Sequence, residues 1–181
     1  MEMKPIESIT KEVIRSFMIE KVLPAIRVKW PREDASKPIF IQQDNARPHI
    51  APNDKLFCEA AKQDGFDIRI VCQPANSPDL NILDLGFFNS LQSIQQKTTC
   101  KTKEELVAAV DKAFEEYQVS KANRIFLTLH GCLNEIMRIG GNNSYNIPHI
   151  RKAMLERQGH LPLQLKCDAA LVNEVMAKIN E

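Results

Sequence analysis

The sequence lacks any apolar run approaching the roughly 20 residues of a membrane-spanning helix, and it lacks the apolar core of a secretory signal near its start. Its five cysteines are scattered, with no Cys-x-x-Cys motif and no cysteine–histidine ligand spacing. This pattern argues against a disulfide framework or a zinc site and for reduced thiols. We therefore expect a protein of the cytosol or the nucleus that is neither secreted nor embedded in a membrane.

An excess of charge of either sign is also missing, because 24 Lys and Arg residues balance 23 Asp and Glu residues to leave a net charge of +1. The whole chain therefore carries no electrostatic signal for nucleic acid, although a local basic face stays open. With 181 residues, of which 44% are hydrophobic, the chain is long enough for a domain with a sizeable core.

Two short runs of β-branched and aromatic residues, 38–43 and 67–72, predict strands. Between them the sequence predicts a helix that is capped by Asn53 or Asp54 and ends near Gly65. Its expected inward residues are Leu56, Phe57, Ala60 and Ala61. A strand, a helix and a strand within this length predict a right-handed βαβ unit with parallel strands.

Helical periodicity predicts the rest of the chain. A Thr-x-x-Glu capping box opens one of these helices, and we interpret Phe87 and Phe88 as core residues. We expect an α/β part over 1–100 and a helical extension of the same domain over 101–181. The helices are expected at 11–28, 82–97, 102–117, 120–139, 150–158 and 167–179.

Two aspartates are the candidate catalytic and metal-binding residues. Asp44 comes directly after the first predicted strand, and Asp84 lies in the first turn of the helix that follows the second. Ligands of parallel sheets gather at the carboxyl ends of the strands, so we expect the two carboxylates to face each other there. Such a pair can hold divalent ions that promote phosphoryl transfer, and oxygen ligands favour Mg²⁺ or Mn²⁺.

Structural roles are the alternative for both residues. Asp44 can form an Asx turn with the backbone after it. Asp84, three residues after Asn81, can complete a capping box or interact with the helix dipole. Arg47 and His49, beside Asp44, can contact nucleic-acid phosphate or can belong to a solvated loop.

The strings around these aspartates resemble the DDE/D catalytic domain of Tc1/mariner transposases. The similar segments are Gln-Asp-Asn-Ala-Arg-Pro-His (43–49) and Gln-Pro-Ala-Asn-Ser-Pro-Asp-Leu-Asn-Ile-Leu-Asp (73–84). Positions 45–83 separate the two aspartates, an interval of 39 residues that resembles the plant mariner-like branch. The resemblance implies an RNase H-like fold, DNA as a partner, and Asp44 and Asp84 as the second and third members of a metal-binding triad.

The chain departs from that family in two respects. No acid before Asp44 ends a β-run, so none matches the family's first aspartate, and the family's helix-turn-helix DNA-binding region has no counterpart. We therefore expect an incomplete RNase H-like fold, a truncated transposase domain that holds Mg²⁺ or Mn²⁺ weakly and is inactive alone. The unpaired edge of the remaining parallel strands predicts a homo-oligomer or pairing with another chain. The rival hypothesis is a non-catalytic module that binds a full-length transposase, and a gene remnant without a role is a third.

Overall fold

A parallel pair of strands lies in the N-terminal part of the chain, in a computed structural model that describes residues 6–180. Strands β1 (Ile39–Gln43) and β2 (Ile68–Cys72) pair in register, Ile39 opposite Ile68 and Gln43 opposite Cys72. Within the described residues the sheet contains these two strands alone, so each strand has one open edge. The predicted strands, and the helix between them, are confirmed.

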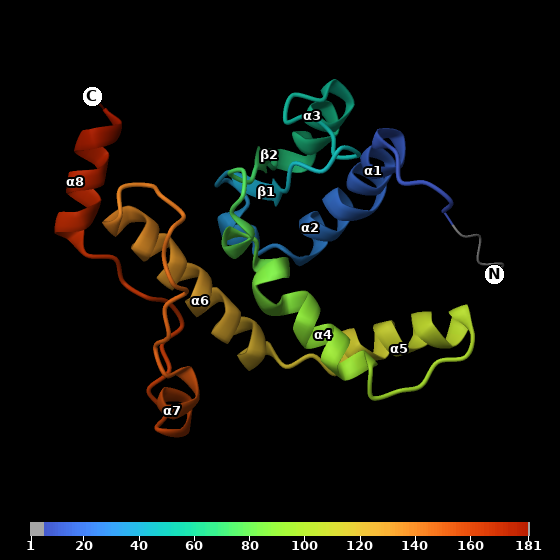
Figure 1. The fold of residues 1–181 in the computed structure, drawn as a ribbon. Coiled ribbons are helices and arrows are strands. Elements are labelled where there is room, and N and C mark those ends of the chain that lie inside the picture. Colours follow the sequence, from blue (N-terminus) through green and yellow to red (C-terminus); the bar gives the residue numbers. More distant parts are fainter. Residues whose placement is uncertain (1–5, 181) are drawn as a thin grey trace. The chain divides into compact units, whose positions relative to one another are not determined.

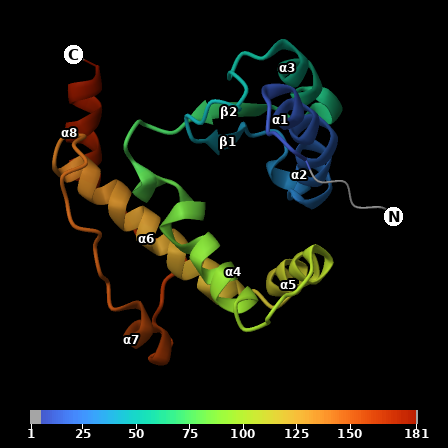
Figure 2. The same ribbon diagram turned by 45° about the vertical axis from the view of Figure 1, so that its right-hand side comes forward.

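Three helices accompany the strands. α1 (Lys11–Phe17) continues through a π-helical segment, Met18–Val22, into α2 (Leu23–Lys29), as the periodicity over 11–28 predicts. α3 (Lys55–Ala61) connects the strands (Figure 1). Figure 2 shows these helices gathered on one side of β1 and β2.

The core of this region lies between that face of the sheet and the helices. Side chains alternate across a strand, so Ile39, Ile68 and Ile70 share the buried face while Phe40 points away and is 57% exposed. The helices contribute Leu23, Phe57 and Ala61 to the same buried cluster.

The expected inward position of Leu56 is wrong. Leu56 is 58% exposed, whereas its neighbour Phe57 is fully buried. Consecutive residues of an α-helix are rotated by about 100° around its axis, so a short helix that buries Phe57 and Ala61 on one face turns Leu56 toward solvent.

The C-terminal part is helical. A π-helical turn, Leu83–Phe87, leads into α4 (Phe88–Gln95), and α5 (Lys103–Glu115) follows. The predicted capping box at the start of α5 is confirmed, because the Thr102 hydroxyl accepts from the Glu105 backbone N–H and the Glu105 carboxylate accepts from the Thr102 backbone N–H.

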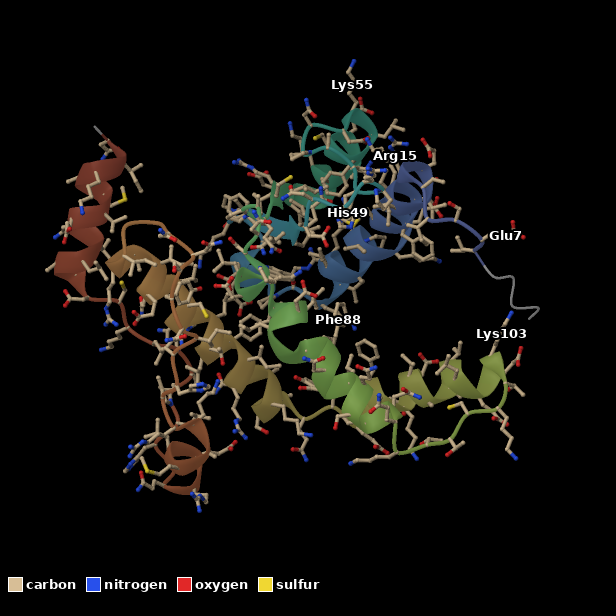
Figure 3. All side chains as sticks on the ribbon, in the orientation of Figure 1. Glu7, Arg15, His49, Lys55, Phe88 and Lys103 are labelled. Carbon is tan, nitrogen blue, oxygen red and sulfur yellow. The ribbon has the colours of Figure 1, made fainter. Side chains whose placement is uncertain are left out.

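Three further helices complete the chain: α6 (Val119–Arg138), α7 (Lys152–Arg157) and α8 (Ala169–Ile179). All three were expected from the sequence, within a few residues at each end. Phe87 packs as predicted, edge-on to Tyr117 with ring centroids 5.0 Å apart. The core interpretation of Phe88 is wrong, since this side chain is 53% exposed on α4 (Figure 3).

The chain divides into two compact units between Ala75 and Asn76. The protein is thus a mostly helical α/β protein with a two-stranded parallel sheet. Over residues 6–180, no helix combines the length and the apolar character needed to cross a membrane.

Candidate functional site

Asp44 directly follows the last residue of β1, at the carboxyl end of the parallel sheet. Its Oδ1 atom accepts a hydrogen bond from the Ala46 backbone N–H at 2.8 Å. This is the Asx turn that was the structural alternative for this residue. The Asp44 side chain remains 49% exposed. The turn and access to a ligand are therefore compatible.

His49 is the second candidate that the structure places beside Asp44. Its Nδ1 atom lies 2.9 Å from Asp44 Oδ1 and 2.9 Å from the Asp44 backbone carbonyl oxygen. A hydrogen on Nδ1 can therefore be donated to either oxygen. The His49 side chain is 26% exposed and is labelled in Figure 3. Arg47, between the two in sequence, is exposed.

Amide side chains that sequence reasoning missed hold the loop after β1. The Asn45 Nδ2 atom donates to the Gln73 carbonyl at 2.9 Å, which links this loop to the residue after β2. The Gln43 Nε2 atom donates to the Ile50 carbonyl at 2.7 Å. The available signal was the polar string Gln-Gln-Asp-Asn at a strand end, since amides can bond the carbonyls that a sheet leaves unpaired. The loop that carries Asp44 is thus held by two side-chain amide hydrogen bonds.

Asp84 lies within the π-helical turn that precedes α4. Its Oδ2 atom accepts from the Asn81 side-chain amide at 2.8 Å, and Asn81 Oδ1 accepts from the Leu83 backbone N–H at 3.1 Å. A capping box would instead join the Asp84 carboxylate to the Asn81 backbone N–H. Asn81 therefore forms an Asx turn, and Asp84 orients its amide.

Each aspartate keeps one carboxylate oxygen outside these contacts, Oδ2 of Asp44 and Oδ1 of Asp84. Such oxygens suit Mg²⁺ or Mn²⁺. Asp44 belongs to the first compact unit and Asp84 to the second, so the convergence of their carboxylates stays a prediction. Over residues 6–180, no three His, Cys, Asp or Glu side chains form a group that could hold a metal ion.

A partly buried ion pair in the first unit joins Arg15 of α1 to Asp54. The Arg15 guanidinium Nε lies 3.0 and 3.1 Å from the two carboxylate oxygens, and Nη2 lies 2.9 Å from Oδ2. Asp54 also caps α3 by accepting from the Phe57 backbone N–H at 3.1 Å. The hydrogen bond from Arg15 lowers the pKa of Asp54, the Phe57 N–H adds to this, and burial opposes it.

Of the two predicted caps, Asp54 and not Asn53 caps α3, because its side chain accepts from the Phe57 backbone N–H. Arg15 and Asp54 are 39 positions apart in the sequence, so no local sequence pattern predicts their ion pair. The contact is structural, and its side chains are 27% and 12% exposed.

Comparison of the chain with protein-family models, with curated proteins and with solved structures finds no match in any of the three.

Proposed function

We propose that this chain forms part of a DDE/D catalytic domain of the Tc1/mariner transposase type, with an incomplete RNase H-like fold and DNA as its partner. The motif strings around Asp44 and Asp84 support this proposal, and so does their placement after β1 and after β2. The single observation that carries it is the exposed carboxylate of Asp44 at the carboxyl end of a parallel strand, where such sheets bind ligands.

As the family resemblance implies, Asp44 and Asp84 would be ligands of a Mg²⁺ or Mn²⁺ ion, and each keeps one carboxylate oxygen outside its local turn. A divalent ion there would supply Lewis-acid stabilisation of a phosphoryl-transfer reaction. His49, through its contact with Asp44 Oδ1, orients the carboxylate, and exposed Arg47 offers a cation for a DNA phosphate. Two carboxylates provide few ligands, so this chain alone should bind the ion weakly and leave DNA uncut.

Metal binding is tested by titrating the ¹⁵N-labelled chain with Mn²⁺, whose unpaired electrons broaden nearby amide signals. We expect broadening around both Asp44 and Asp84, and its loss at both places in Asp44→Asn and in Asp84→Asn. Asp111→Asn, which removes an exposed carboxylate from α5, is the matched control and should change neither. Broadening around only one of the two aspartates would refute a shared site.

Catalysis is tested with supercoiled plasmid DNA in the presence of Mn²⁺. We expect no nicking by the purified chain. Nicking that survives repurification and is abolished by Asp44→Ala would contradict the view that this chain is inactive alone.

A second function, binding to a full-length transposase, is favoured by the surface of α5. Four large apolar residues of this helix are between 38% and 53% exposed: Leu106, Val107, Val110 and Phe114. Exposed apolar residues in such density are typical of protein interfaces. A pull-down with an intact mariner-like transposase tests this role. Binding that persists in Asp44→Ala and Asp84→Ala but disappears in Val110→Asp would favour interaction over catalysis.

A further inference from the structure

A polar pocket of about 390 Å³ lies between α4 and α6, entirely within the second compact unit. Figures 1 and 2 both show these helices next to each other. Its volume falls in the range of about 300–1,000 Å³ that is usual for ligand sites. The pocket is lined by Asn89, Ser90 and Ser93 of α4 and by Lys121, Arg124 and Ile125 of α6.

Helical spacing and one close approach create this pocket. Lining residues recur three or four positions apart on each helix, so each set forms one face. Just before α4, Gly86 lets the chain lie against α6, since a Cβ atom there would be 3.3 Å from Ile125 Cγ1. Short polar side chains on the next turns of α4 do not fill the space beyond this contact, and the pocket remains.

The charge of the pocket is positive. Its lining includes two cations, two hydroxyls and an amide, and no carboxylate. Arg124 forms an ion pair with Glu156 of α7, whose Oε2 lies 3.6 Å from Nη1, with both side chains 40% exposed. An ion pair that open is weak and readily exchanged.

Lys152 of α7 contacts α6 beside the pocket residue Arg124. The Lys152 Nζ atom donates to the Arg124 carbonyl at 2.9 Å and to the Thr128 hydroxyl. Burial lowers the pKa of Lys152, and the neighbouring charge of Arg124 lowers it further. The two hydrogen bonds of Lys152 attach α7 to α6 at Arg124 and Thr128.

We propose that this α4–α6 pocket binds a phosphate group, either as a free phosphate compound or as a phosphodiester of a nucleic acid. Arginine and lysine form their strongest hydrogen bonds with phosphate oxygens, and serine hydroxyls and an asparagine amide supply the remaining donors. Neither Asp44 nor Asp84 lines this pocket. The inference therefore extends beyond the proposed metal site and does not depend on it.

The first arm of the test titrates the ¹⁵N-labelled full chain with inorganic phosphate at constant ionic strength. We expect saturable amide shifts at the lining residues, lost in Lys121→Gln/Arg124→Gln and at least weakened in Ser90→Ala/Ser93→Ala, which keeps the net charge. The matched control, Lys112→Gln/Arg138→Gln, removes two exposed cations from α5 and α6 and should bind as the unmodified chain does. Absent shifts, or shifts that survive in the two pocket variants, would overturn the proposal.

The second arm distinguishes the source of the phosphate. Binding of a DNA duplex is measured at several salt concentrations for the same variants. For a nucleic-acid phosphodiester, the slope of log K against log [salt] falls in magnitude by about 1 for each pocket cation removed, and less in the control. Equal slopes in all variants, with phosphate binding intact, assign the pocket to a free phosphate compound. This arm depends on the DNA-related proposal, whereas the phosphate arm and the Mn²⁺ titration fail or succeed separately.

Discussion

Replacement of Asp54 by alanine should destabilise the first compact unit, because one carboxylate serves both a helix cap and an ion pair. The change removes the Asp54 carboxylate. This group caps α3 and also forms the ion pair with Arg15, with N···O distances of 2.9–3.1 Å. Loss of a helix cap costs about 1 kcal/mol, and loss of a hydrogen bond to a charged group costs about 1.5–3 kcal/mol. Because Asp54 is only 12% exposed, solvent replaces these contacts poorly, and we expect a loss of about 2–4 kcal/mol in the free energy of unfolding.

The assay is urea unfolding followed by the fluorescence of Trp30, the single tryptophan of the chain. Trp30 adjoins the end of α2 in the same unit and is 40% exposed, so its emission reports on this region. A loss of about 2 kcal/mol lowers the urea midpoint by about 1–2 M. Asp54→Asn is the matched control: asparagine caps helices as well as aspartate does but cannot pair with the guanidinium charge, so its loss should be intermediate.

The pH dependence follows from the lowered pKa of Asp54. A carboxyl whose pKa is lower in the folded than in the unfolded state adds stability that is complete above the unfolded pKa, about 3.9. That stability is lost as the pH falls through the folded value. The difference between the unmodified chain and Asp54→Ala should therefore be constant near neutral pH and shrink below about pH 4. A variant as stable as the unmodified chain at pH 7, or a difference that grows in acid, would refute the reasoning.

Three further substitutions test the packing. Phe57→Ala removes a fully buried ring and should cost about 3–5 kcal/mol by urea unfolding, whereas Leu56→Ala, 58% exposed, should stay within about 0.5 kcal/mol. Gly131→Ala would place a Cβ atom 2.7 Å from Pro148 Cγ, so it should lower the thermal midpoint of the second unit, followed by circular dichroism; an unchanged midpoint would show that the proline moves freely. Thr102→Ala removes the cap of α5 and should cost about 1 kcal/mol, while Thr102→Ser should restore most of it.

Local patterns sufficed for most of the secondary structure. The helix at the start of the chain, the two strands and the capping box at Thr102 depend on residues within one or two turns of each other, and such signals are visible in the sequence. Errors arose where a neighbour in sequence was taken for a neighbour in space. Leu56 adjoins the buried Phe57 and Phe88 adjoins the half-buried Phe87, and the helical rotation turns Leu56 and Phe88 outward.

The candidate site divides in the same way. The sequence indicated Asp44 and its Asx turn, because both depend on three consecutive residues after a strand. The contact with His49 and the bracing of the loop by Gln43 and Asn45 appear only when the chain folds back on itself. Whether Asp44 and Asp84 share an ion depends on contacts over still longer distances, and the Mn²⁺ titration tests it.

Composition and spacing by themselves determined that this chain forms an α/β start and a helical remainder, with two aspartates placed after its parallel strands. Hydrogen bonds within a turn and the periodicity of apolar side chains depend on residues close in sequence, so both can be predicted from short segments. Only the tertiary structure decided that Arg15 forms an ion pair with Asp54. It alone also decided that Lys121 and Arg124 line one pocket with two serines of α4, Ser90 and Ser93. These polar groups come into contact because the packing of apolar faces brings distant segments together. Short sequence patterns do not predict which polar residues that packing places side by side.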